Sequence, residues 1–581
     1  MENKKVILSV KDLEVKFHVR GRVLTAIRGI SLDIYEGESI AIVGESGSGK
    51  SVFTKTFAGM LDSNGFIDNG SIIFSDDELA DTVVDYDATA KSEIKRIQDA
   101  LDLNSKMENG ADTFRALEKL EAERVAREGF SEEEQDEYEA KLKEMKDAKI
   151  DLFNYKQTID SKDKAQIKQI AKQIEEKEAE IKNFEKLHEM ERQKRAEISK
   201  NDIVYNKEYE QRRAVLDEQY KKEIETPISE ETKKRNEILA KEVYLSVGRF
   251  KRNKRKKAID NLLEQLTKAM KIGVDLNDES QRNAVFKNVT FRVRYEDETE
   301  NQLHGTAILD LAKVENPADW NKIRGRKVAT VFQDPMTSLN PVITIGKQMT
   351  AIIIKHQKCS EGEARKRAIE LMSKVGITHP EKRFDDYPFQ YSGGMRQRIV
   401  IAIALSCQPK ILICDEPTTA LDVTIQAQIL QLIKDLQKEF GFTIVFITHD
   451  LGVVANIADR VAVLYAGQIV EVGTVKEVFY DPHHPYTWAL LSSLPQLAER
   501  NTKLFSIAGT PPSLYNKIKG DAFAPRNQYC LKIDTLQAPP MFKVTDTHYA
   551  KTWLLHPSAP QIEKPEGIRD IHEKLIKAFN I

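Results

Sequence analysis

Apolar and polar positions alternate along the first 75 residues. Residues 6–17, "VILSVKDLEVKF", interleave Val, Leu and Phe with Lys, Asp and Glu, which predicts a half-buried strand. A second alternating run at 31–43 ends in the apolar segment "SIAIV", and a glycine-rich loop follows at once. The pattern of apolar residues predicts a helix that leaves this loop at 52–61 and one more strand, "GSIIF", at 70–74.

The pattern changes between about Ser75 and Gly305, where Glu, Lys, Asp and Arg dominate. Apolar residues in this block recur at heptad spacing. They are Ile167, Ile170, Ile174, Ile181 and Phe184, with Lys177 as a polar interruption and His188 next in the series. This spacing predicts a helical hairpin or a short coiled coil. The run "RFKRNKRKK" at 249–257 adds a basic segment.

From residue 306 onward, apolar segments of strand length alternate with longer helical patterns. The predicted strands are 410–415, 442–450 and 460–473. Strands separated by helices indicate a mainly parallel sheet, so the expected fold class is α/β. The last 100 or so residues are richer in Pro and predict a small appended domain or tail.

The composition is that of a globular chain with a raised charge content. Of 581 residues, 41% are apolar and 31% are charged, and the net charge of −3 argues against a polycation that binds nucleic acid. No apolar run reaches the roughly 18 residues of a membrane span, and the N-terminus lacks the features of a signal peptide. The simplest expectation is a cytoplasmic protein that reaches a membrane only through partners.

The cysteines carry no evident chemistry. They are Cys359, Cys407, Cys414 and Cys530. None forms a C-x-x-C pair, so neither a disulfide framework nor a zinc site is predicted.

Residues 44–51, "GESGSGKS", match the phosphate-loop pattern G-x-x-x-x-G-K-[ST]. The glycines let backbone N–H groups turn toward an anion, and the following helix adds its positive N-terminal end. Lys50 can reach the β- and γ-phosphates, and Ser51 can hold Mg²⁺. So short a pattern also occurs by chance in glycine-rich turns, but the buried strand before it and the helix after it favour a phosphate loop.

Two acids, Asp415 and Glu416, end the apolar segment "KILICDEP". Unpaired carboxylates at the edge of a core are costly, which favours a functional reason for them. The alternative is a helix N-terminus whose dipole favours acids. Asp415 suits a water-mediated contact to Mg²⁺, and Glu416 suits a general base for the attacking water.

Further motifs follow the phosphate loop in a fixed order: "VFQDP", "YSGGM", "ICDEP", "ALD" and "ITHD". Taken alone, "YSGGMRQR" is only a helix N-cap with a flexible approach. The whole series resembles the ATPase domain of ABC transporters, over all of the chain except the charged block and the tail. The resemblance implies a mainly parallel sheet core, a small antiparallel subdomain and a helical signature subdomain.

The resemblance also implies a role for each motif residue. Gln333 senses Mg²⁺ and the γ-phosphate, and His449 contacts the γ-phosphate beside the base Glu416. Asp422 is the D-loop aspartate, and Phe17 stacks on adenine unless it is a core residue of its strand. The other nucleotide-binding residues are Gly44, Glu45, Ser46, Gly47, Ser48, Gly49, Lys50, Ser51 and Val52. The Mg²⁺ contacts are Ser51, Gln333 and, through water, Asp415, and the signature is Ser392, Gly393, Gly394 and Met395.

One chain carries one phosphate loop and one signature. In the family, ATP lies between the phosphate loop of one subunit and the signature of another. The resemblance therefore implies a partner ATPase domain, with ATP and Mg²⁺ as cofactors.

Two classes outside transport share this ATPase. DNA-maintenance ATPases of the SMC type also split it with a coiled coil, but their Q-loop precedes the coil, whereas Gln333 follows the charged block here. Translation factors of the ABC-F type carry two ATPase domains in one chain. The order and number of motifs favour a transport motor over either class.

The segments that flank the motifs narrow the resemblance. "VFQDPMTSLNPVITIGKQ", "DEPTTALDVTIQAQIL" and "HHPYTWALLSSLP" are similar to ATP-binding subunits of oligopeptide, dipeptide and nickel importers. The C-terminal segment is similar to their D-type oligopeptide subunit. This implies a heterodimer with an F-type ATPase, two transmembrane permeases, a peptide-binding lipoprotein outside the cell, and a peripheral place on the cytoplasmic face of the membrane. Nucleic acid is not an expected partner, and dipeptides or nickel are alternative cargo.

Many relatives hold an iron–sulfur cluster in this tail through spaced cysteines. Here Asp521, Asn527 and Asp534 stand at three of the expected positions, and only Cys530 lies nearby. No iron–sulfur cluster is predicted, because such clusters need several cysteine ligands.

The predicted organisation has four segments. Residues 1–75 and 306–480 form the ATPase domain, 76–305 form a charged helical insertion, and 481–581 form the C-terminal tail domain. The insertion lies at a loop of the antiparallel subdomain, where loop closure costs grow slowly with length. Its role is open among an accessory arm without chemistry, a protein-docking arm, and a basic patch that touches anionic lipid or RNA.

Overall fold

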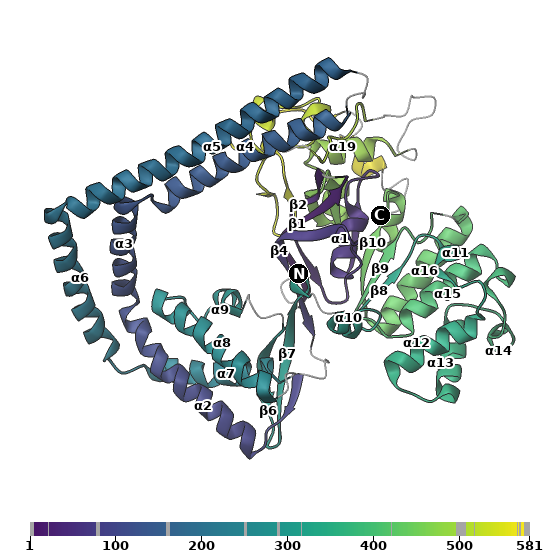
Figure 1. Cartoon of the computed structure of the whole chain (residues 1–581). Helices are drawn as coiled ribbons and strands as arrows, with labels where there is room; N and C mark the ends of the chain where they lie inside the picture. Colours follow the sequence, from purple (N-terminus) through teal and green to yellow (C-terminus); the bar gives the residue numbers. More distant parts are fainter. Residues whose placement is uncertain are drawn as a thin grey trace. The chain divides into compact units, whose positions relative to one another are not determined.

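The computed structural model describes residues 5–20, 22–76, 82–158, 163–248, 252–286, 291–314, 317–419, 421–494, 507–515, 518–565, 568 and 571–574. The chain divides into two compact units (Figure 1). The first comprises Met1–Asp76 and Ile308–Ile581, and the second comprises Asp77–Ala307.

The first unit is built on a sheet with a parallel centre. In spatial order the strands are β13 (Phe542–Lys543), β14 (Tyr549–Ala550), β12 (Gln468–Thr474), β11 (Arg460–Tyr465), β3 (Ser39–Val43), β10 (Thr443–Ile447), β9 (Ile411–Asp415) and β8 (Val328–Val331). The strands from β11 to β8 run parallel, whereas β12, β14 and β13 add an antiparallel edge. β3 and β10 are buried along their whole length, which explains their continuous apolar runs.

An antiparallel layer accompanies this sheet in the first unit. Its strands are β1 (Val6–Val19), β2 (Arg22–Tyr35) and β4 (Gly65–Asp76), and β1 pairs with both of the others. Buried and exposed positions alternate along β1 because its sequence alternates. The predicted parallel core with an antiparallel subdomain is therefore confirmed.

Helices complete the first unit. They are α1 (Lys50–Phe57), α10 (Pro317–Ile323), α11 (Pro335–Ser338), α12 (Ile345–Gln357), α13 (Glu361–Lys374), α14 (Pro380–Arg383), α15 (Gly393–Leu405), α16 (Val423–Phe440), α17 (Leu451–Ile457), α18 (Val475–Tyr480) and α19 (Pro485–Ser492). α12, α13, α15 and α16 share one apolar core with β8, β9 and β10. Figure 1 shows α12, α13 and α15 gathered beside β8 and β9. These helices form the predicted helical subdomain.

The C-terminal tail shares an apolar core with the sheet. Trp488, Leu491 and Phe523 are buried in the same cluster as Val43 and Val463, which belong to β3 and β11. The strands β13 and β14 extend the sheet edge beyond β12. The tail is thus packed against the strand that leads to the phosphate loop.

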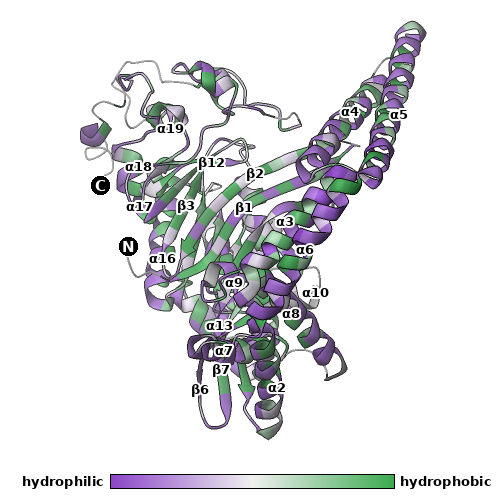
Figure 2. Ribbon diagram, turned by 90° about the vertical axis from the view of Figure 1, so that its left-hand side faces the viewer, coloured by the Kyte–Doolittle hydropathy of each residue, from purple (hydrophilic) through white to green (hydrophobic). Residues whose placement is uncertain are grey.

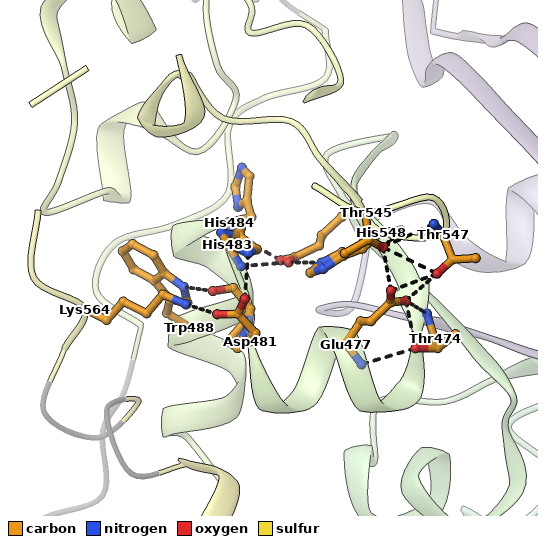
Figure 3. Close-up of polar contacts among 12 residues, drawn as sticks. Thr474, Glu477, Asp481, His483, His484, Trp488, Thr545, Thr547, His548 and Lys564 are labelled. Atoms are coloured by element: carbon orange, nitrogen blue, oxygen red, sulfur yellow. Dashed lines mark hydrogen bonds and ion pairs between the residues drawn. The ribbon is translucent and has the colours of Figure 1, made fainter. Parts of the chain in front are cut away.

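Polar contacts also hold the tail to β12 and α18 (Figure 3). Thr545 and Thr547 donate to Glu477 Oε1 at 2.6 and 2.8 Å, and Lys564 pairs with Asp481. Burial raises the pKa of Glu477, but hydrogen bonds, led by that from Thr545, lower it more, and the result is about 2. Glu477 therefore holds the tail as a carboxylate.

The second unit is mostly helical. Its elements are β5 (Val83–Asp85), α2 (Ala88–Ser105), α3 (Ala111–Glu128), α4 (Glu132–Thr158), α5 (Lys164–Asn201), α6 (Ile203–Ile224), α7 (Glu230–Ser246), α8 (Arg252–Ile272), α9 (Glu279–Val285), β6 (Phe291–Glu298) and β7 (Gln302–Asp310), which crosses into the first unit. β5 and β6 pair with β7. Helices α2, α7 and α8 pack together and bury Ile97, Leu239, Val243 and Leu266. This unit thus has a core of its own besides a hairpin.

The hairpin is formed by α4 and α5, which lie side by side (Figure 1). With 38 residues, α5 is about 57 Å long at 1.5 Å per residue. Ile170 and Ile181, two heptad positions, are buried, and Tyr138 stacks on His188 with ring centroids 3.5 Å apart. Figure 2 shows the hairpin as mainly hydrophilic. Residues 249–251 of the basic segment lie outside the described residues.

Candidate active site

The phosphate loop connects β3 to α1 and has a backbone that only glycine accommodates. Gly44 and Gly49 have φ angles of +155° and +105°. A Cβ at Gly44 would lie 2.2 Å from the Leu464 carbonyl oxygen, and one at Gly49 would lie 3.1 Å from that of Ala26. Ser46 and Gly47 form the exposed tip, whereas Ser48 is buried. The loop and the N-terminus of α1 together make an anion-binding arrangement.

Lys50 lies folded over the loop. Its Nζ donates to the carbonyls of Gly44 at 2.8 Å and Glu45 at 3.0 Å. Burial lowers the pKa of Lys50, and the carboxylates of Glu416, Asp415 and Glu45 oppose that shift. The ammonium group thus sits among acids at the place where phosphate would bind. Val52, the third residue of α1, is half-buried.

Ser51 and Asp415 bring oxygen atoms from two elements together. Ser51 Oγ donates to Asp415 Oδ1 at 3.2 Å. Asp415 is the last residue of β9 and lies opposite Ile447 of β10. Burial raises the pKa of Asp415, and the hydrogen bond from Ser51 opposes this shift. Hydroxyl and carboxylate oxygens are ligands that Mg²⁺ prefers, so this pair fits a magnesium site.

Glu416 is the centre of a hydrogen-bond cluster. Its Oε2 accepts from Gln333 Nε2 at 3.0 Å and from Thr419 Oγ1 at 3.2 Å, and its Oε1 lies 3.1 Å from His449 Nδ1. The backbone of Glu416 has φ +45°, and its N–H donates to the Ile447 carbonyl at 3.0 Å. This left-handed turn after β9 fixes the carboxylate between the loops that follow β8 and β10.

The predicted residues Gln333, Glu416 and His449 therefore meet at one carboxylate. Each follows a strand of the parallel sheet, and the carboxyl ends of parallel strands share one edge. Thr419 is an addition that sequence reasoning missed, although it stands in the quoted segment "DEPTTALD".

The signature residues lie at the N-terminus of α15. Ser392 caps this helix and accepts from the Met395 N–H at 3.3 Å, and Ser392 and Gly393 are exposed. A Cβ at Gly394 would lie 2.7 Å from Ile425 Cγ2, so glycine allows α15 to approach α16 closely. Among the described residues, no hydrogen bond joins the signature to the phosphate loop.

Asp422 and Phe17 complete the predicted set. Asp422 is exposed and caps α16, because its Oδ1 accepts from the Ile425 N–H at 2.9 Å. Phe17 lies on β1 with 8% of its surface exposed. A Cβ at Gly65 would lie 2.6 Å from its ring, so Phe17 packs in the core. Its contact with adenine stays a prediction.

The tail positions at which cluster-binding cysteines would be expected do not fit an iron–sulfur cluster. Asp521, Asn527 and Asp534 accept from nearby backbone N–H groups at 3.0, 2.9 and 2.6 Å. Cys530 is the one thiol among these four positions, and clusters are held by cysteine thiolates. Across the described ranges, no group of three His, Cys, Asp or Glu is placed to hold a metal.

Three features of the site define a nucleotide-hydrolysing cassette. Lys50 lies buried over a glycine loop, and Ser51 and Asp415 bring two oxygens together. Glu416 lies between Gln333 and His449. The family model described as "ABC transporter" matches residues 27–201 and 292–419. A second, "Oligopeptide/dipeptide transporter, C-terminal region", matches residues 470–533. The chain belongs to the ABC transporter family, and its tail is of the oligopeptide/dipeptide transporter type.

Curated relatives agree with this placement. The chain is 64% identical over 266 residues to the oligopeptide transport ATP-binding protein AmiE of Streptococcus pneumoniae, a match over 46% of this chain and 75% of that protein. It is 61% identical to the oligopeptide transport ATP-binding protein OppD of Bacillus subtilis, over 45% and 73%. It is 56% identical to the dipeptide transport ATP-binding protein DppD of Lactococcus lactis, over 47% and 77%. In the part of the chain that is described, no helix is both long and apolar enough to cross a membrane.

Proposed function

We propose that this chain binds and hydrolyses ATP as the motor subunit of an importer for oligopeptides. The observation that carries the ATPase part is the placement of Glu416 between Gln333 and His449, beyond Lys50 and the phosphate loop. The names of AmiE and OppD support the cargo. The relative named as a dipeptide transport protein makes dipeptides the second candidate.

The chemistry that this chain supplies follows from its contacts. The loop N–H groups and Lys50 bind the phosphates of ATP and offset their charge. Glu416 accepts a proton from the attacking water, and Gln333 and His449 hold its two oxygens so that it faces the nucleotide. We expect Gln333 and His449 to contact the γ-phosphate region once ATP is bound.

Mg²⁺ would be held by Ser51 Oγ, with Asp415 acting through a water and Gln333 nearby. When bound, the ion neutralises phosphate charge that develops during transfer. The hydrogen bond between Ser51 and Asp415 holds the hydroxyl in place for this role. A site with few protein ligands suits Mg²⁺, which keeps several waters.

The exposed signature supports a two-cassette arrangement. Ser392 and Gly393 present the N-terminus of α15 to solvent, and helix N-termini bind anions. We infer that they cap an ATP held by a second ATPase subunit, of the F type, while Asp422 lies between the two sites. The further partners are two permeases and an extracytoplasmic peptide-binding lipoprotein, with this chain peripheral on the cytoplasmic face of the membrane.

The role of the second unit is a separate proposal. Because the motif residues lie in the first unit, we propose that residues 77–307 act as an accessory arm without chemistry. Docking of a protein partner and contact with anionic lipid or RNA are the alternatives.

The proposed function is tested by purifying the tagged chain from its native membranes in mild detergent and identifying its partners. Two multi-span permeases, a second ATPase and a lipoprotein support the importer. Ribosomes or DNA-bound proteins would overturn it while leaving the ATPase intact. Lys50→Ala is the matched control, because it should keep the partners but abolish ATP hydrolysis. Uptake of labelled tripeptides and dipeptides by a strain that lacks the chain then decides the cargo.

A further inference from the structure

The tail reaches the phosphate loop through Arg526. Its guanidinium forms a two-pronged ion pair with Glu45, with Nη1 2.8 Å from Oε2 and Nη2 3.1 Å from Oε1. Nη1 also donates to the Tyr465 hydroxyl at 3.2 Å, and Nε donates to the Ala508 carbonyl at 2.9 Å. Only 5% of the Arg526 side chain is exposed. The guanidinium is therefore fixed from several sides, and a lysine could not reproduce its geometry.

Three aromatic rings pack together beside this contact. The ring centroids of Tyr465, Tyr486 and Phe523 lie 4.5, 5.3 and 5.4 Å apart. The Tyr486 hydroxyl accepts the backbone N–H of Glu45 at 2.8 Å. Both the backbone and the side chain of Glu45 are thus held by residues that lie far along the chain.

Glu45 brings a negative charge into a loop that binds phosphate. Like charges repel strongly where water is partly excluded. Lys50 donates to the Glu45 carbonyl and also interacts electrostatically with the Glu45 carboxylate. An unpaired Glu45 would therefore compete with phosphate for the Lys50 ammonium group. The pairing with Arg526 supplies a second cation for this carboxylate and leaves Lys50 to the nucleotide.

We propose that Arg526 is a positioning residue for ATP: by pairing with Glu45 it cancels a negative charge that would otherwise repel the phosphates and compete for Lys50. The affinity for ATP then depends on the docked tail. This rests on the proposed ATP binding by the loop. Because Arg526 touches no reacting atom, it acts on the binding of ATP and not on the rate at saturation.

The test is a charge cycle on the full-length protein, purified with its partners, with binding followed by a fluorescent ATP analogue. Arg526→Ala should raise the dissociation constant for ATP about tenfold. Glu45 loses its charged hydrogen-bonded partner and is left as an unpaired acid beside the phosphates. The double variant Glu45→Gln with Arg526→Ala should return to within about threefold of the unmodified protein, since both charges are gone. The KM for ATP should follow binding, while kcat stays within about twofold.

Controls separate this proposal from a structural role and from the ATPase assignment. Arg365→Ala removes the ion pair between Arg365 of α13 and Asp385 and should leave ATP affinity unchanged. If the double variant binds no better than Arg526→Ala, the charge argument is overturned. Should Arg526→Ala not fold, Glu45→Gln decides, because it should bind at least as tightly as the unmodified protein, and a tenfold loss would overturn the proposal. Normal binding by Lys50→Ala would instead refute the phosphate loop itself.

Discussion

Glu416→Gln separates the catalytic role of this carboxylate from its structural role, because it keeps the shape of the side chain and removes its charge. The carboxylate accepts from Gln333 and Thr419 on one oxygen and meets His449 Nδ1 on the other. An amide can place its oxygen toward the first pair and its NH₂ toward an unprotonated Nδ1. All three contacts survive, so the free energy of unfolding should change by no more than about 1 kcal/mol.

The expected loss in hydrolysis is far larger. A general base contributes roughly 10²–10⁴-fold to a rate, which is about 3–5 kcal/mol of barrier. Lys50 and the loop keep their contacts, so ATP affinity should stay within about threefold. ATP should then accumulate between closed cassettes.

Three assays on the purified complex measure these effects. Phosphate release gives the rate of hydrolysis, nucleotide binding gives the ATP affinity, and size-exclusion chromatography detects the closed cassettes. Thr419→Val is the matched control, since it removes one hydrogen bond from Glu416 and keeps the carboxylate; a loss below about tenfold is expected. Hydrolysis by Glu416→Gln at the unmodified rate would show that another group is the base. An equal loss in Thr419→Val would show that positioning, and not proton transfer, sets the rate.

Three further predictions concern the rest of the chain. Replacing residues 77–304 by a short Gly-Ser linker should leave ATP binding within about threefold, and loss of binding by a folded deletion protein would contradict this. Lys327→Met should lower the free energy of unfolding by about 3–5 kcal/mol, because Nζ lies 2.8 Å from Asp76 Oδ2 with both side chains buried; an unchanged urea midpoint would refute it. The pKa of Glu477 falls from 4.5 to about 2 on folding, so it stabilises above pH 4.5 and this contribution is lost as pH falls toward 2. Glu477→Gln should lower the free energy of unfolding by about 1–2 kcal/mol at pH 7 and should flatten its dependence on pH between about 2 and 4.5. If the slope in this pH range is unchanged, Glu477 is not its source.

The cluster around Glu416 was predictable because sequence marks where strands end. Apolar runs that stop at Asp415 and just before His449 place both residues at the carboxyl edge of a parallel sheet. Gln333 follows another such run, so the motif series leaves few alternatives to a common site. The structure adds the atom-level contacts, which depend on the left-handed turn at Glu416. No sequence pattern predicts that a glutamate adopts a positive φ.

Other features had no usable signal. Arg526 lies 481 positions from Glu45, and neither residue stands in a periodic pattern that could pair them. In the second unit, the high content of charged residues gave no sign that some of them are buried in a core. Arg235 is 8% exposed and pairs with Glu108 at 2.7 Å, whereas composition treats both as surface residues. Charged residues are buried only when partners satisfy them, and partners are a property of the fold.

The position of β3 has a consequence for synthesis of the chain. This strand lies between β10 and β11, which leave the ribosome only after the whole second unit. The contacts between α4 and α5 and between α2 and α7 need no residue beyond that unit. Domains fold as units during synthesis, so we expect the second unit to be complete while the phosphate loop still waits for its neighbouring strands. Arg526 is made later than both strands, so we expect the full affinity for nucleotide only after residue 526 has been synthesised and has paired with Glu45.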